Sequence, residues 1–232
     1  MAIKAVLFDM DGTLIDSVYA HVGAWWQAFA ECGVEVPHWE IHRRIGMDGD
    51  RLVDELLTGF GGEQVDTDAV AERASALHSR YYEDAAKRVR PLPGARQLLH
   101  AVHERGLVIV VATTSSPHEL DLARTVLDCD SVISAATTGD DVEEAKPDPT
   151  VVALALERAG VDADDAVFIG DATWDARAAG RAGVRAIAVR TGGIGDAELW
   201  SAGFARIVDT PAQVLAAIDE LTASDADVVR DR

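Results

Sequence analysis

Two aspartates separated by one residue follow the first strand-like segment of the chain. Asp9 and Asp11 come directly after residues 3–8 (IKAVLF), an apolar run typical of a buried strand, and Gly12 follows them. The period of two in an extended segment would place both carboxylates on one side, and Gly12 permits a sharp turn that brings backbone amides toward an anion. Carboxylates this close repel each other, which favours a shared cation or a held proton. The same residues also suit a plain turn, so this segment alone leaves both interpretations open.

Hydroxyl groups follow the second strand-like run. Thr113 and Thr114 come after residues 107–112 (LVIVVA) and precede Pro117, where a helix is expected to begin. Hydroxyls and free amides at a helix N-terminus form an anion site. The alternative is ordinary N-capping of that helix.

A lysine stands before a proline later in the chain. Pro147 pushes Lys146 toward an extended conformation, which would hold the ammonium in a defined loop. Such a group could neutralise a phosphate or a nucleophilic carboxylate, although a solvated loop lysine has the same local pattern.

Two further aspartates follow a third apolar run. Gly170 and Asp171 follow residues 166–169 (AVFI), and Asp175 comes four residues after Asp171. If a helix begins near Ala172, Asp171 and Asp175 face the same way, as ligands of a hard cation would. An acidic residue at a helix N-terminus is also an ordinary partner of the helix dipole.

The elements that must position these residues alternate between strands and helices. Near-continuous apolar strands separated by helices indicate a parallel sheet covered on both faces, an α/β doubly wound fold, in which ligands bind beyond the carboxyl ends of the strands. The strands are predicted at residues 3–8, 107–112, 131–134, 166–169 and 184–189. The helices between and after them are predicted at residues 93–105, 117–127, 149–159, 174–182 and 211–221.

One stretch interrupts this alternation. Residues 17–89 contain no good strand and are expected to form an inserted helical domain, with helices at 20–31, 50–59 and 67–87. The catalytic core would then comprise residues 1–16 and 90–232, with a frayed acidic tail from Ser224.

The combination of the four strand ends is more specific than any one of them. Asp9-Met10-Asp11-Gly12-Thr13, then Thr113, Lys146-Pro147 and Gly170-Asp171-Ala172-Thr173-Trp174-Asp175 resemble, in order, the four motifs of the haloacid dehalogenase superfamily. The resemblance extends from Val6 to about Gly193. The helical insert resembles the C1 cap of the subfamily that includes phosphoglycolate phosphatase and β-phosphoglucomutase.

The resemblance implies a mechanism and a role for each residue. Asp9 would attack phosphorus to give an aspartyl-phosphate, and Asp11 would protonate the leaving oxygen and later deprotonate the hydrolytic water. Thr113, Thr114 and Lys146 would bind the phosphoryl oxygens. Mg²⁺ would be held by Asp9, the backbone carbonyl of Asp11, Asp171 and Asp175.

The resemblance also bears on the cap and on the activity. Arg44 and Arg51 occupy a segment similar to the cap loop that reads the substrate, so they are candidate contacts to a distal anionic group. The expected activity is a Mg²⁺-dependent phosphatase acting on a small phosphorylated metabolite. A phosphosugar mutase and a non-catalytic phosphate-ligand sensor on the same fold are the alternatives, and the presence of Asp11 disfavours a dehalogenase.

Composition limits the partners. The 232 residues carry a formal net charge of −19, which disfavours nucleic acid and anionic membranes and requires a local cation for an anionic substrate. Cys32 and Cys129 are expected to be free thiols, and the absence of a visible secretory signal predicts a cytoplasmic protein, as a monomer or homodimer. The His38 and His42 pair lacks a third nearby ligand, so packing is expected of it rather than zinc binding.

Overall fold

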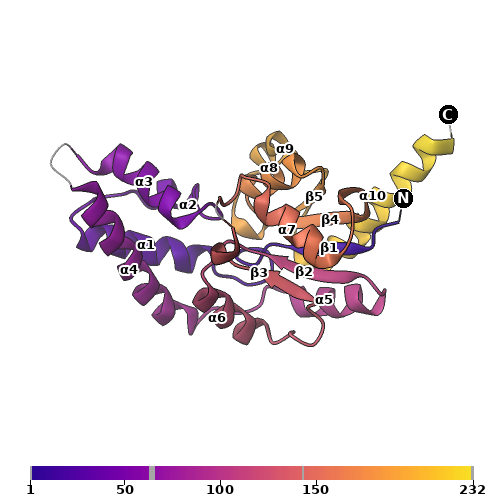
Figure 1. Ribbon diagram of the computed structural model, residues 1–232, viewed down its shortest axis with the longest axis horizontal. Helices are drawn as coiled ribbons and strands as arrows, with labels where there is room; N and C mark the ends of the chain where they lie inside the picture. Colours follow the sequence, from indigo (N-terminus) through magenta and orange to yellow (C-terminus); the bar gives the residue numbers. More distant parts are fainter. Residues whose placement is uncertain (1, 63–65, 143, 231–232) are drawn as a thin grey trace.

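The protein is built on a parallel sheet, seen here in a computed structural model that describes residues 2–62, 66–142 and 144–230 (Figure 1). The pairings between its described strands are all parallel, in the order β3-β2-β1-β4-β5-β6. The strands are β1 (Ala5–Phe8), β2 (Val108–Ala112), β3 (Ala135–Thr137), β4 (Ala166–Gly170), β5 (Arg185–Val189) and β6 (Arg206–Val208). The predicted α/β doubly wound fold is confirmed.

Helices cover both faces of this sheet because its strands are apolar on both sides. Val6 and Phe8 of β1 join the apolar cluster formed with α5, α6 and α10, whereas Ala5 and Leu7 join the cluster formed with α7, α8 and α9. In Figure 1, α5 and α6 lie below the strands and α8 and α9 above them. These helices are α5 (Ala95–Glu104), α6 (Pro117–Leu127), α7 (Thr150–Ala159), α8 (Thr173–Arg181), α9 (Asp196–Ala202) and α10 (Val214–Arg230).

A second helical layer stands between β1 and α5 in the sequence. Its helices pack around an apolar cluster of their own, which includes Trp25, Phe29 and Leu56, and they lie together at one end of the molecule in Figure 1. Among these helices, α1 and α4 pack against each other most extensively. The four helices, referred to below as the α1–α4 unit, are α1 (Val18–Glu31), α2 (His38–His42), α3 (Gly49–Phe60) and α4 (Thr67–Ala86).

Short helical turns complete the chain. They are η1 (Gly139–Asp141), η2 (Ala163–Asp165), η3 (Arg190–Gly192) and η4 (Pro211–Gln213). None of the described helices combines the length and the apolar character that crossing a membrane requires.

Two local predictions are wrong. The strand expected at residues 131–134 lies instead at Ala135–Thr137, because Val132 packs into the core while pairing with β2 begins only where the backbone amide of Ser134 reaches the carbonyl of Ile109. The tail expected to fray continues α10 through Arg230, and residues 214–230 contain neither glycine nor proline to end the helix.

Candidate active site

The central strands bring the predicted aspartates together at one edge of the sheet. β1 lies between β2 and β4, with Phe8 opposite both Val111 and Ile169. The backbone amide of Asp9 donates to the carbonyl of Ile169 at 2.9 Å, which fixes the end of β1 beside the end of β4. Asp9 and Asp171 therefore leave adjacent strands side by side, as expected for the carboxyl ends of parallel strands.

Lys146 reaches this edge from the loop that precedes α7. Its side chain is 1% exposed, and its ammonium lies 2.5 Å from Oδ1 of Asp9 and 2.9 Å from Oδ1 of Asp175. Burial lowers the pKa of Lys146, but Asp175 and Asp9 outweigh burial and raise it. The lysine is thus a cation held between two buried carboxylates.

Three carboxylates form an oxygen cluster next to that lysine. Asp9, Asp171 and Asp175 each offer one oxygen, and these oxygens lie within 4.8 Å of one another. Oδ2 of Asp175 accepts from the backbone amides of Asp171 and Ala172 at the start of α8, at 3.1 and 3.0 Å. Thr13 donates its hydroxyl to Oδ1 of Asp171 at 3.0 Å, so the cluster is oriented by neutral donors as well as by Lys146.

The cluster fits a divalent cation. Oδ1 of Asp175 is buried and accepts no hydrogen bond from the described residues, although the Lys146 ammonium lies near it. Burial, with the neighbouring charges of Asp175 and Asp11, raises the pKa of Asp9 to about 7 against the opposing effect of Lys146. Burial and then Asp175 and Asp9 likewise raise the pKa of Asp171 well above its ordinary value. Carboxylate oxygens are the hard donors that Mg²⁺ prefers, and a bound cation would favour the ionised form that their mutual repulsion opposes.

Two glycines leave room around Asp171. A Cβ on Gly192 would lie 1.8 Å from Oδ2 of Asp171, and one on Gly12, whose φ is +76°, would lie 2.5 Å from the same oxygen. The hydroxyl of Thr191 donates to the carbonyl of Gly12 at 2.5 Å and joins the two loops. Both glycines therefore allow backbone to approach a carboxylate that a larger residue would displace.

Asp11 lies apart from the oxygen cluster and faces α1. Its carboxylate accepts from the hydroxyls of Ser17 at 2.5 Å and Ser115 at 3.0 Å, and Nε2 of His21 lies 3.3 Å from Oδ1. Burial raises the pKa of Asp11, but His21 and the two hydroxyls outweigh burial and lower it to about 2. Asp11 is therefore an ionised carboxylate held at the junction of the sheet and the α1–α4 unit.

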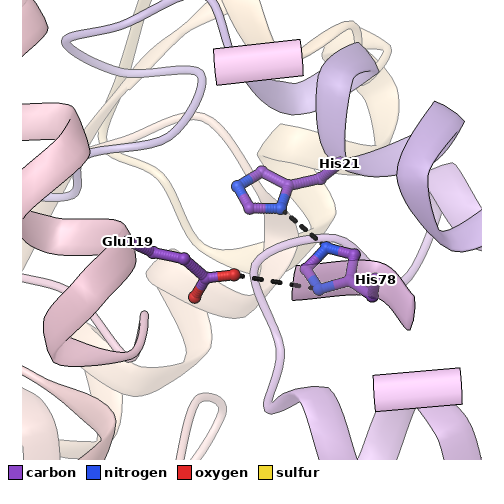
Figure 2. Close-up of side chains that lie close together, drawn as sticks. All are labelled: His21, His78 and Glu119. Atoms are coloured by element: carbon purple, nitrogen blue, oxygen red, sulfur yellow. Dashed lines mark hydrogen bonds and ion pairs between the residues drawn. The ribbon is translucent and has the colours of Figure 1, made fainter. Parts of the chain in front are cut away.

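A chain of side chains that the sequence analysis missed continues from Asp11 (Figure 2). Nδ1 of His21 lies 3.1 Å from Nε2 of His78, and Nδ1 of His78 lies 3.8 Å from Oε1 of Glu119. The three residues come from α1, α4 and α6, and the two imidazoles are buried against Tyr82. No motif marks them, because only the packing of α4 against α1 and α6 brings them together.

A cavity of about 390 Å³ opens over the reactive edge. Its walls come from the strand ends, from the first part of α6 and from the α1–α4 unit. Thr113 and Thr114 line it, and the Thr113 hydroxyl donates to Ser115 at 2.9 Å. The lining also includes Asp9, Asp11, His21, Trp25, Met47, Asp48, Asp50, Leu52, Ser75, His78, Ser79, Glu119 and Asp140.

The structure does not bring Arg44 and Arg51 to this cavity. Arg44 pairs with Glu40 at 2.6 Å and with Glu55 at 3.2 Å, and Arg51 pairs with Glu55 at 3.1 Å. Neither arginine is among the residues that line the cavity. Acidic neighbours within the α1–α4 unit hold both guanidinium groups elsewhere.

The His38 and His42 pair makes packing contacts. His38 stacks on Trp26 with ring centroids 4.7 Å apart, and His42 stacks on Tyr19. Nε2 of His42 lies 2.8 Å from the carbonyl of Gly192, so α2 rests on the loop beside Asp171.

Comparison with known proteins agrees with this geometry. The family model of haloacid dehalogenase-like hydrolases matches residues 6–189. A phosphoglycolate phosphatase from Nitrosospira multiformis is 32% identical over 197 residues, covering 83% of this chain and 85% of that protein. An N-acetylmuramic acid 6-phosphate phosphatase from Pseudomonas aeruginosa is 29% identical over 94% of this chain and 96% of its own length.

Solved structures share the whole fold. A hydrolase from Pseudomonas syringae superposes with a TM-score of 0.87 at 34% identity, over 94% of this chain and 98% of that one. A Bacteroides vulgatus protein, provisionally named a β-phosphoglucomutase, superposes with a TM-score of 0.80 at 25% identity, over 96% of this chain and 90% of that one. The chain therefore belongs to the haloacid dehalogenase-like hydrolase family, and its relatives place it among the phosphatases of that family.

Proposed function

We propose that this enzyme is a Mg²⁺-dependent phosphatase that hydrolyses a small phosphomonoester through an aspartyl-phosphate on Asp9. The observation that carries the proposal is the buried cluster of Asp9, Asp171 and Asp175 around Lys146, at the base of a cavity that also contains Asp11. A nucleophile, a metal-capable oxygen set and a separate acid/base group are the parts that this reaction requires.

The proposed chemistry divides the residues by role. An oxygen of Asp9 attacks phosphorus, and the P–O bond to the leaving group breaks as the leaving oxygen takes a proton from Asp11. Asp11 acquires that proton when the substrate binds, because the negative phosphate beside it favours the protonated carboxyl. Asp11 then removes a proton from water, which attacks the same phosphorus and releases Asp9 and inorganic phosphate. Lys146 and the hydroxyls and amides of Thr113 and Thr114 bind the phosphoryl oxygens throughout.

Mg²⁺ would be held by Asp9, Asp171 and Asp175, together with the backbone carbonyl of Asp11. When bound, it supplies positive charge that screens the repulsion between the Asp9 carboxylate and the phosphate. Asp175 also positions Lys146, whose ammonium lies 2.9 Å from its Oδ1.

The α1–α4 unit is proposed to act as a cap domain, comprising residues 17–89, over a core of residues 1–16 and 90–232. The unit contributes His21, Trp25 and His78 to the wall of the cavity, opposite Thr113 and Thr114 of the core. Enclosure by such a cap excludes bulk water and favours small substrates over polymers.

The test is phosphate release by the purified protein. We expect hydrolysis of p-nitrophenyl phosphate or acetyl phosphate with Mg²⁺ and none after EDTA treatment. Asp9→Asn should abolish activity, because an amide does not attack phosphorus, whereas Asp16→Asn, at an exposed position in the same segment, should leave activity intact. Activity retained in Asp9→Asn would refute the mechanism.

A phosphosugar mutase is the second candidate, supported by the similarity to the Bacteroides vulgatus structure. In a mutase the phosphoryl group passes from Asp9 to a second hydroxyl of the sugar. Measuring isomer formation and free phosphate in the same reaction distinguishes the two activities.

A further inference from the structure

The wall of the cavity beyond the reactive aspartates is acidic. Asp48, Asp50, Glu119 and Asp140 line it in addition to Asp9 and Asp11, and no lysine or arginine of the described residues does. The whole chain carries a formal charge of −19, so the surrounding field has the same sign as this wall.

The exposed carboxylates of this wall are not neutralised by neighbours. Asp50 and Asp140 are exposed and have no ion-pair partner in the described part of the chain. Asp48 accepts from the backbone amides of Asp50 and Arg51, which caps α3 without adding a cation. The exposed part of the wall therefore presents net negative charge to a ligand that enters the cavity.

The two histidines of the wall do not offset this charge. His21 lies against Asp11, so any charge on its ring compensates a carboxylate that is already present. His78 is buried against His21 and Trp25, and its pKa is lowered well below the ordinary value by burial and then by His21, which leaves the ring neutral. Neither imidazole is available to bind a second anionic group of a substrate.

The remaining wall suits an uncharged hydroxylated molecule. Ser75 and Ser79 add hydroxyl groups from α4, and Trp25, Met47 and Leu52 add an apolar face. Hydroxyls and carboxylates accept hydrogen bonds from the hydroxyl or ammonium groups of a ligand, and an aromatic ring packs against its carbon skeleton.

We infer that the group esterified to phosphate in the substrate is a neutral or cationic polyol or amino alcohol, and not one that carries a carboxylate or a second phosphate. This inference rests on the proposed phosphatase function and specifies its substrate class. A second anion would lie against Asp50 and Asp140 with no cation to receive it, which opposes binding.

The test compares three phosphate esters of similar size but different charge: phosphoethanolamine, hydroxyethyl phosphate and phosphoglycolate. We expect kcat/KM for the first two to exceed that for phosphoglycolate by about tenfold or more. Each compound also competes with p-nitrophenyl phosphate, so inhibition constants give the same ranking where turnover is slow. A ranking with phosphoglycolate first, or a hexose bisphosphate preferred to its monophosphate, would overturn the inference.

Charge reversal in the wall gives a second measurement. Asp50→Lys and Asp140→Lys should each raise kcat/KM for phosphoglycolate relative to phosphoethanolamine by about fivefold or more. Glu35→Lys, at an exposed position away from the cavity, makes the same change in net charge and should leave that ratio unchanged. An equal change in all three variants would show that only the overall charge matters. Failure of the phosphatase proposal is a different result, namely no Mg²⁺-dependent hydrolysis of p-nitrophenyl phosphate.

Discussion

The ammonium of Lys146 lies 2.5 Å from Oδ1 of Asp9, and both side chains are almost fully removed from solvent. The lysine lies within reach of Asp175 as well, so one buried cation compensates two carboxylates. Pairs of this kind contribute little net stability when intact, but the loss of one partner leaves the other charge buried and unpaired.

Replacing Lys146 should therefore affect both stability and catalysis. We expect Lys146→Met to lower the free energy of unfolding of the metal-free protein by about 3–5 kcal/mol, measured by urea denaturation at neutral pH. The matched control is Lys4→Met, because Lys4 pairs with Asp165 at 2.5 Å while 63% exposed, and the loss of an ion pair in water should change the free energy of unfolding far less. Equal effects of the two substitutions would contradict the role assigned to burial.

The raised pKa of Asp9 predicts how the metal-free protein responds to pH. A carboxyl group whose pKa rises on folding binds more protons in the folded state, so the free energy of unfolding falls as pH rises through the window between the unfolded and folded values, here from about 4 to about 7. The raised pKa of Asp171 acts in the same direction. Mg²⁺ binds the ionised form and should reverse the trend above neutral pH.

Unfolding at about pH 5 and about pH 8, in EDTA and in Mg²⁺, checks this prediction. Asp9→Asn cannot ionise at that position, so its stability in EDTA should change less between the two pH values than that of the unmodified protein. Greater stability of the metal-free protein at the higher pH would show that the burial of Asp9 does not dominate.

The separation of Asp11 from the metal-capable cluster predicts a kinetic signature. Asp11→Asn keeps the nucleophile Asp9 but removes the group that deprotonates the hydrolytic water. p-Nitrophenolate is a good leaving group that needs little protonation, so the first step should continue. We expect a burst of p-nitrophenolate that approaches the enzyme concentration, followed by turnover about 100-fold slower or more. Asp16→Asn should show no burst, and a burst absent from both variants would argue against Asp11 acting in the second step.

Asp9 and Asp171 show what the sequence can predict about this site. Each follows a near-continuous apolar strand, and the carboxyl ends of neighbouring parallel strands share one edge, so the pattern alone predicts their proximity. The residues next to Lys146 in the sequence do not predict that it is buried in the site, because a lysine before a proline is equally compatible with a solvated loop. The resemblance to the family motifs supplied that position, and burial between two carboxylates agrees with it.

His78 and Arg44 show what the sequence could not predict. His78 reaches the cavity because α4 packs along α1, a tertiary contact that leaves no local pattern. Arg44 was assigned to the substrate because a basic residue occupies a suitable loop, but Glu40 and Glu55 lie close enough to pair with it. The Glu40 pair has the i, i+4 spacing that helical periodicity favours, whereas Glu55 meets Arg44 only through the packing of α3 beside α2, which periodicity does not predict.

The substitution Gly192→Ala tests whether metal binding requires the space beside Asp171. A methyl group at this position would lie 1.8 Å from Oδ2 of Asp171, which forces the carboxylate or the loop to move. Gly195 is the matched control, because it lies three residues further along the same loop, a Cβ there meets nothing within 4 Å, and its φ of −71° suits any residue. We expect Gly192→Ala to weaken Mg²⁺ binding by about tenfold or more, measured by calorimetry, and to lower phosphatase activity at limiting Mg²⁺. Gly195→Ala should behave as the unmodified protein. If Gly192→Ala instead bound Mg²⁺ normally, Asp171 would be free to move without loss of the site, and its assignment as a fixed metal ligand would be wrong.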